Sequence, residues 1–203
     1  MPTPGHDNSA AAPRSQLWLV RHGETEWSAA GRHTSRTDLD LTPAGVAAAL
    51  GVGDKVAGTS FARVLSSPLR RARRTAELAG HADADVAEDL HEWDYGTDEG
   101  LTTRQIRETR PGWTVWRDGP ADGETAADVG ARADRVIDLV RTGNAPVLAF
   151  SHGHFCRVLG ARWLGLPVGD GAHLALSTAS VSVLGWERDT PSVLHWNHTG
   201  TLC

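Results

Sequence analysis

The chain has 203 residues, of which 22% are charged and 40% hydrophobic, and its formal net charge is -5. These are ordinary values for a globular protein, and they exclude a largely disordered chain. The acidic balance argues against a general nucleic-acid-binding protein. Two cysteines, Cys156 and Cys203, do not make a disulfide framework, and no stretch reaches the length of a membrane span.

Residues 1–16 are rich in Pro, Ala and Ser and lack the apolar core of a secretory signal. We predict that they are a disordered leader and that residues 17–203 form a single domain. We also expect a cytoplasmic location and no nucleic-acid or membrane partner. The sequence leaves the oligomeric state open, and a homodimer is compatible with it.

The first predicted strand is the apolar run from Leu17 to Val20, which breaks into the charged tripeptide Arg21-His22-Gly23. Residues 28–41 form a polar loop, and connections of this length are often binding loops. Thr42 and Pro43 are a good N-cap and first residue for the alanine-rich helix that follows, over residues 44–57.

Strands and helices alternate along the rest of the chain. We predict strands at 61–65, 86–90, 146–150, 180–185 and 192–196, and helices at 69–79, 102–110, 124–141 and 155–164. Residues 112–123 contain two tryptophans with several Gly and Pro and suggest a packed loop or a lid. The alternation predicts an α/β fold, a three-layer α/β/α sandwich with a mostly parallel central sheet.

Three of the predicted strands end in polar residues that suit an anion. If these strands are adjacent, their carboxyl ends meet at one edge of the sheet, where ligands bind in open α/β folds. Two imidazoles and at least two guanidiniums then surround one point, and a guanidinium fork matches two phosphate oxygens at once. We therefore predict a phosphate ligand. The residues concerned are Arg21 and His22, Ser66 and Ser67 with the arginines that follow at 70–74, and Ser151 and His152.

Two histidines at such a site allow phosphoryl transfer without a metal or other cofactor. One neutral imidazole attacks phosphorus, and water then hydrolyses the phosphohistidine. The arginines and the second histidine, if it is protonated, spread the charge of the transferring group. The leaving alkoxide needs a proton from an acid, and Glu92 is favoured because the neighbouring Trp93 and Tyr95 can desolvate it.

The segment Arg21-His22-Gly23-Glu24-Thr25-Glu26-Trp27 resembles the signature of the histidine phosphatase superfamily, also called the phosphoglycerate mutase-like family. Segments 66–76, 92–100 and 151–154 resemble the other motifs of that family, in the same order. The resemblance implies that His22 is the nucleophile and Glu92 the proton donor. It also implies that the phosphoryl group is bound by Arg21, Arg71 and His152.

Residues 31–42, 103–106 and 113–123 are similar to a phosphatase branch of the family that includes sedoheptulose bisphosphatase and actinobacterial acid phosphatases. Ser28 stands where the family's mutases usually carry Asn. We therefore expect a metal-independent phosphatase acting on a small phosphorylated metabolite, such as a sugar phosphate or a related phosphomonoester. A cofactor-dependent phosphoglycerate mutase is the alternative, and a binding module that has lost turnover is a hypothesis of another class.

Further candidates for substrate contact each have a structural alternative. The hydroxyls of Thr34 and Ser35 can bind a substrate or satisfy the loop backbone. Arg104 lies on a predicted helix that can cover the pocket and contact a second anionic group. His154 can touch substrate or pack against the next helix, and a metal site with His152 is disfavoured because the arginines would repel a cation. The full set is Ser28, Thr34, Ser35, Arg104 and His154.

The arginine-rich segment 70–74 does not direct all of its side chains into the site. Helical spacing prevents four arginines from facing inward together. We expect Arg71 to face the site because, in the family pattern, the phosphate-binding arginine directly precedes an alanine. Arg70, Arg73 and Arg74 are expected in solvent.

Overall fold

The computed structural model describes residues 14–200 and contains one mixed sheet of six strands in the order β3-β2-β4-β1-β5-β6. The neighbouring pairs β1–β4, β2–β4 and β2–β3 are parallel, whereas β5 is antiparallel to both β1 and β6. The strands are β1 (Leu17–Arg21), β2 (Arg63–Ser66), β3 (Asp85–Val86), β4 (Val147–Ser151), β5 (Val181–Glu187) and β6 (Thr190–His198).

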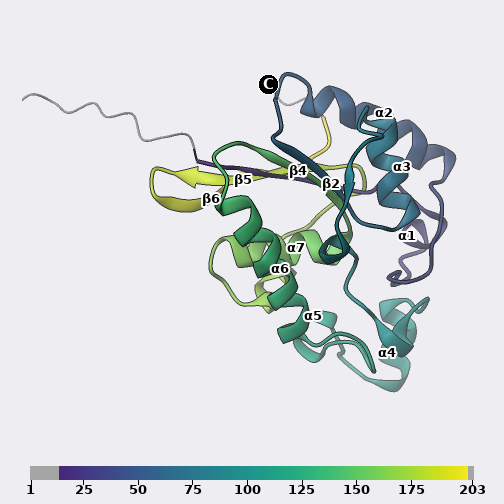
Figure 1. Cartoon of the computed structure of the whole chain (residues 1–203). Helices are drawn as coiled ribbons and strands as arrows, with labels where there is room; N and C mark the ends of the chain where they lie inside the picture. The colour runs from purple at the N-terminus through teal and green to yellow at the C-terminus, as the bar shows by residue number, and fades with distance from the viewer. Residues whose placement is uncertain (1–13, 201–203) are drawn as a thin grey trace, which may run out of the picture.

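Helices cover both faces of the sheet and make three layers (Figure 1). On one face lie α2 (Pro43–Val56) and α3 (Arg70–Leu78), and on the other α6 (Ala126–Arg141) and α7 (Gly153–Trp163). The predicted α/β/α sandwich is therefore confirmed. Because both faces are covered, β4 is buried along its whole length, and this explains its continuous apolar sequence.

Two hydrophobic cores lie on the two faces of the sheet, and the strands supply them alternately. In β1, Leu17 and Leu19 join the core that includes residues of α6 and α7, whereas Val20 joins the core that includes residues of α2 and α3. This period-two alternation is the pleat of a strand that is buried on both sides. It fixes the register of β1 and therefore the position of the residues that follow it.

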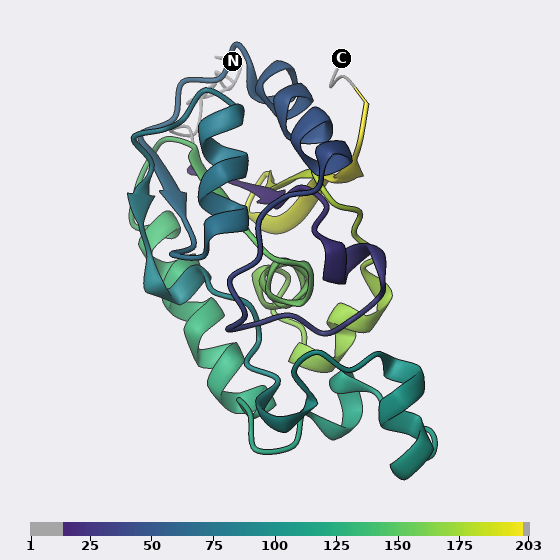
Figure 2. The same ribbon diagram turned by 90° about the vertical axis from the view of Figure 1, so that its right-hand side faces the viewer.

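Short helices occupy the connections at the carboxyl edge of the sheet. Figure 2 shows α4 at the end of the molecule far from the sheet. These elements are α1 (Glu26–Ala29), α4 (Thr103–Thr109), α5 (Val115–Asp118) and the 3-10 helices η1 (Glu88–Leu90), η2 (Gly96–Asp98) and η3 (Val168–His173). The sequence did not predict α1, α5, η2 or η3, since one or two turns give too little periodicity to detect.

The strand predicted at residues 86–90 is wrong in extent. β3 pairs only with the last two residues of β2, and residues 88–90 form a 3-10 helix instead. The chain leaves the sheet here because it must cross the carboxyl edge, where the Ser151 hydroxyl donates to the carbonyl of Leu90 at 2.7 Å. The early exit from the sheet delivers Glu92 to that edge.

The predicted leader lies mostly outside the described residues. Residues 1–13 and 201–203, including Cys203, lie outside the described residues, so most of the predicted leader is not described. The Ser15 carbonyl accepts from the indole of Trp186 at 3.0 Å, and the Gln16 carbonyl accepts from the Val147 amide at 2.9 Å. The folded part therefore begins before Leu17.

The loop after β1 packs against the first turn of α2. The two backbones come so close that each has a glycine at the contact. A Cβ on Gly45 would lie 2.1 Å from the Glu24 carbonyl oxygen, and one on Gly23 would lie 2.6 Å from the Gly45 oxygen. The Gly23 amide also donates to the hydroxyl of Thr75 on α3 at 3.0 Å. The backbone after β1 is thus held between two helices.

We predict that Gly45→Ala destabilises the protein by about 3 kcal/mol, the upper range for overpacking, because the methyl group has no room. Gly51→Ala, at a site in α2 with open space around the added carbon, is the matched control. It should stabilise by about 0.5–1 kcal/mol through helix propensity. Urea unfolding of the two variants measures this, and equal effects would contradict the close contact.

Candidate active site

The carboxyl ends of β1 and β4 bring two histidines together, as the sequence predicted. Arg21 pairs with Ser151 in the parallel register, and His22 and His152 directly follow the ends of these two strands. Their ring centroids are 5.1 Å apart at an interplanar angle of 61°, and both side chains are buried. β2 lies on the other side of β4, so Ser66 and Ser67 complete this edge.

His22 is held in the form that a nucleophile requires. Its Nδ1 lies 2.7 Å from the Gly23 carbonyl, which can only accept, so Nδ1 carries the proton and Nε2 carries the lone pair. Burial lowers the pKa of His22 well below its usual value, and Arg71 and Arg21 lower it further. The imidazole is therefore neutral at neutral pH.

Arg71, on the first turn of α3, connects three parts of the site. Its Nε donates to Nδ1 of His152 at 3.1 Å, and its two terminal nitrogens donate to carbonyls of the loop after α1. Those acceptors are the carbonyls of Thr34, Ser35 and Thr37, at 3.2, 3.0 and 2.9 Å. Four of its five N–H directions are used, so one terminal N–H of this fully buried side chain has no protein partner among the described residues.

His152 orients Arg71 rather than presenting a charge of its own. Its Nδ1 accepts from Arg71, so Nε2 carries the proton and donates to the Ser67 hydroxyl at 2.7 Å. Burial lowers the pKa of His152 well below its usual value, with Arg71 adding to the effect. The structure therefore favours a neutral His152, whereas the sequence analysis considered a protonated one.

Arg21 offers an unused donor beside His22. One terminal nitrogen donates to the Leu176 carbonyl at 2.5 Å, while Nε is buried and without a hydrogen-bond partner among the described residues. A Cβ on Gly153 would lie 3.3 Å from this nitrogen, so the small residue at the start of α7 gives the guanidinium its place. A buried unpaired N–H of this kind is costly unless a ligand binds it.

Glu92 lies at the N-terminus of α7, within the same site. Its carboxylate accepts three backbone N–H groups, from Trp93, His154 and Phe155, at 2.9, 3.0 and 2.8 Å. The first N–H groups of a helix have no partner within the helix and are natural donors to an anion. Those of His154 and Phe155 in the first turn of α7 have this role here. The side chain is fixed in the wall that it shares with Arg21 and His22.

Sequence reasoning missed Arg132, which holds the main chain around Glu92. Its guanidinium donates to the carbonyls of Asp89, His91 and Glu92 and pairs with Glu124 at 2.7 Å. It lies on the buried face of α6, next to Val129 and Ala133. An arginine on the apolar face of a predicted helix is a signal that could have identified it, because a buried charge needs a partner.

A cavity of about 240 Å³ opens onto this edge of the sheet. Three of the five predicted substrate contacts, Ser28, Thr34 and His154, line it together with three of the predicted catalytic residues. Four further side chains, those of Arg32, His33, Tyr95 and Thr103, also line it and were not predicted as substrate contacts. The lining comprises Arg21, His22, Ser28, Gly31, Arg32, His33, Thr34, Glu92, Tyr95, Thr103, Gly153 and His154.

Two of the predicted substrate contacts do not line this cavity. Ser35 is buried beneath the loop, where its amide donates to the Glu99 carboxylate at 2.8 and 3.0 Å. Arg104 is exposed on α4, whose buried face carries Ile106, so the helix turns Arg104 outward and Thr103 inward. Ser28 lines the cavity, but its hydroxyl already bonds the backbone of Thr25 in a capping box.

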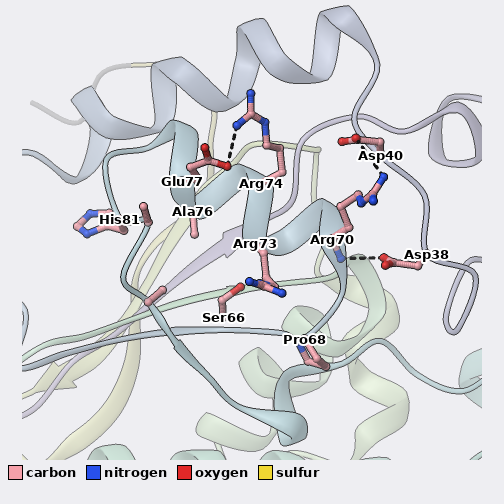
Figure 3. Close-up of a pocket in the computed structure, with 12 residues that line it drawn as sticks. Asp38, Asp40, Ser66, Pro68, Arg70, Arg73, Arg74, Ala76, Glu77 and His81 are labelled. Atoms are coloured by element: carbon pink, nitrogen blue, oxygen red, sulfur yellow. Dashed lines mark hydrogen bonds and ion pairs between the residues drawn. The ribbon is translucent and has the colours of Figure 1, made fainter.

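The other arginines of α3 turn away from the histidines, as expected. Figure 3 shows Arg70, Arg73 and Arg74 around a second cavity of about 510 Å³. Three carboxylates share its lining: Arg70 pairs with Asp40 at 3.6 Å, Arg74 pairs with Glu77 at 2.7 Å, and Asp38 accepts from the Arg70 amide. This larger cavity is therefore balanced in charge and contains neither histidine of the site.

Within residues 14–200, no cluster of three or more His, Cys, Asp or Glu side chains could hold a metal ion. Nδ1 of His154 is hydrogen-bonded to the hydroxyl of Tyr95 at 2.5 Å instead. Across the same residues, no helix combines the length and the apolar character needed to cross a membrane.

We predict that acid destabilises the protein through its buried histidines. Burial lowers the pKa values of His22, His152 and His154 well below their usual value. The unfolded chain protonates them near pH 6.5, so it binds more protons than the folded chain below that pH. The free energy of unfolding therefore keeps this contribution above about pH 6.5. As the pH is lowered further, it falls by up to about 1.4 kcal/mol per pH unit for each histidine.

Urea unfolding between pH 7.5 and pH 5 measures this dependence. His154→Gln, which keeps a hydrogen-bonding group beside Tyr95, should remove the contribution of one histidine and flatten the slope. An unchanged slope in that variant would show that His154 does not stay neutral in the folded protein.

Comparison with known proteins agrees with this geometry. The histidine phosphatase superfamily (branch 1) matches residues 17–199. An acid phosphatase of Mycobacterium tuberculosis is 44% identical over 85% of this chain and 87% of its own length. A sedoheptulose 1,7-bisphosphatase of Saccharomyces cerevisiae is 36% identical over 74% of this chain and 68% of its own length. A probable phosphoglycerate mutase of Salmonella arizonae is 32% identical over 85% of this chain and 86% of its own length.

The fold is similar to that of solved members as well. The structure of an open reading frame of Mycobacterium tuberculosis superposes with a TM-score of 0.87 at 41% identity, and the match covers 92% of this chain and 98% of that one. The relatives named acid phosphatase and sedoheptulose bisphosphatase also fit the branch that residues 31–42 indicated. The chain belongs to the histidine phosphatase superfamily.

Proposed function

We propose that this protein is a phosphatase that hydrolyses a small phosphorylated metabolite through a phosphohistidine at His22. The observation that carries the proposal is the neutral imidazole of His22, with its Nε2 lone pair, beside the unpaired Nε of Arg21 in one cavity. A neutral nucleophile next to a cation that can bind the phosphoryl oxygens needs no metal.

The reaction proceeds in two steps. Nε2 of His22 attacks phosphorus as the bond to the leaving oxygen breaks, and protonated Glu92 gives its proton to that oxygen. Arg21 and the remaining N–H of Arg71 bind the oxygens of the transferring group, whose negative charge they stabilise. Glu92 then takes a proton from water, which attacks the phosphohistidine and releases phosphate and neutral His22.

The substrate is a small sugar phosphate or a related phosphomonoester. A cavity of about 240 Å³ is below the range of roughly 300–1,000 Å³ that is typical of sites for larger ligands. The relatives named acid phosphatase and sedoheptulose 1,7-bisphosphatase support this class. A cytoplasmic location and the absence of nucleic-acid and membrane partners are parts of the same proposal.

Phosphate release from a panel of phosphorylated metabolites tests the function. His22→Ala should lower turnover by roughly 10⁴-fold or more, because the attacking atom is lost. His195→Ala, at an exposed position on β6, is the control and should keep activity. Turnover retained in His22→Ala would refute the nucleophile assignment. No release by the wild-type protein, together with measurable phosphate binding, would favour a binding module instead.

The mutase alternative needs a separate assay, since both reactions form a phosphohistidine. The protein is incubated with 3-phosphoglycerate and a trace of 2,3-bisphosphoglycerate. Release of inorganic phosphate without rapid formation of 2-phosphoglycerate supports the phosphatase, and rapid formation of 2-phosphoglycerate would overturn it.

We predict that Glu92→Gln slows alkyl phosphates much more than aryl phosphates. An alkoxide is a poor leaving group and depends on the proton from Glu92, whereas a nitrophenolate leaves without it. The glutamine keeps one oxygen, which can accept from Trp93 and Phe155, whereas its amide nitrogen cannot accept from His154. The ratio of kcat/KM for the two classes should change by about 10²-fold or more. Equal losses on both classes would exclude Glu92 as the acid.

A further inference from the structure

Arg32 is a cation on the wall of the active-site cavity that the mechanism above does not use. It lies in the loop after α1, beside Gly31 and Thr34, and its side chain is exposed. Glu92 and Arg21 are the other charged side chains of the lining, and both take part in phosphoryl transfer. Arg32 therefore adds a positive charge on the side of the cavity formed by the polar loop.

The position of Arg32 is set by its surroundings. Its amide donates to the Trp27 carbonyl at 2.9 Å, and its backbone pairs with Thr102. The guanidinium lies 5.8 Å from the centre of the Trp27 ring and donates to the Gly100 carbonyl at 3.5 Å. Gly100, at φ +78°, leaves room for that ring, since a Cβ there would lie 3.0 Å from it. The tryptophan supports the arginine at the cavity edge.

Arg32 has no carboxylate partner among the described residues, unlike many other arginines near the site. Arg36 pairs with Asp94, Arg110 with Asp98 and Arg132 with Glu124. The single weak bond to Gly100 leaves most N–H groups of Arg32 available. A guanidinium with free donors at a cavity wall is suited to a planar carboxylate or to a phosphate.

The remainder of the wall does not compete for this role. Burial lowers the pKa values of His33 and His154, so both imidazoles are neutral at neutral pH. Burial raises the pKa of Tyr95 well above its usual value, which keeps the phenol neutral. Arg104, which the sequence suggested for a second anion, lies outside the cavity. Arg32 is thus the side chain placed to attract a negative group away from His22.

We propose that Arg32 determines specificity by binding a second anionic group of the substrate, at the end away from the transferred phosphoryl group. The preferred substrates are then phosphomonoesters that also carry a carboxylate or a second phosphate. This inference rests on the proposed phosphatase function, and it names the substrate class of the same site.

Competition against hydrolysis of p-nitrophenyl phosphate tests the proposal with ligands that need not be turned over. Two pairs differ only in the second anion: 3-phosphoglycerate against glycerol 3-phosphate, and fructose 1,6-bisphosphate against fructose 6-phosphate. In the wild-type protein the member with the second anionic group should compete more strongly in at least one pair. Arg32→Ala should weaken that ligand about 10- to 100-fold more than the partner that lacks this group.

Arg104→Ala removes the same charge from a position outside the cavity and should leave the affinity ratio within each pair unchanged to within about twofold. Arg32→Lys should keep part of the preference, because it keeps the charge but loses the planar guanidinium that binds two oxygens at once. A change confined to the first pair identifies a carboxylate, and one confined to the second pair identifies a phosphate. Equal losses for all four ligands in Arg32→Ala, or no preference in the wild type, would overturn the proposal. A wild type that does not hydrolyse p-nitrophenyl phosphate would contradict the phosphatase function, and direct calorimetric titration of the same ligands would then decide the role of Arg32.

Discussion

The buried guanidinium of Arg71 is the group on which the geometry of the site depends. It faces no carboxylate at hydrogen-bond distance among the described residues. Four of its five N–H donors are satisfied by three loop carbonyls and the neutral ring of His152. A buried charge is tolerated only when its donors are satisfied, so the loop carbonyls and the imidazole must hold these positions. One side chain thereby couples the start of α3, the loop over the cavity and the end of β4.

The same arrangement helps to keep His22 and His152 neutral. Burial and the charge of Arg71 lower the pKa values of both histidines. A neutral imidazole keeps one lone pair, which His22 needs for the proposed attack and which His152 uses to accept from Arg71. The N-terminus of α7 fixes Glu92, so the proposed acid and nucleophile line one cavity without a hydrogen bond between them.

The sequence predicted the layers of the fold and the meeting of three strand ends, because buried parallel strands have a strong apolar signal and their polar ends stand out. It could not predict hydrogen-bond partners that come from distant backbone. Ser35 was expected in the cavity, but its amide donates to the Glu99 carboxylate and its side chain is buried beneath the loop. Arg104 was expected at the substrate, but its direction follows from the burial of Ile106. Of residues 86–90 only Val86 strongly favours a strand, and residues 88–90 form a 3-10 helix whose Leu90 carbonyl accepts from Ser151.

The proposed chemistry and the proposed substrate recognition use different parts of the chain. His22 and His152 are fixed by strand register, and Glu92 by a helix terminus, so these positions hardly change without changing the core. The loop after α1 is held instead by its main chain, with carbonyls on Arg71 and the amides of Ser35 and Thr37 on Glu99. Because backbone groups fix its course, the exposed side chain of Arg32 can be changed without moving the loop, whereas His33 is buried against Tyr95 and Trp113. The proposed specificity residue can therefore be altered separately from the proposed phosphoryl-transfer site.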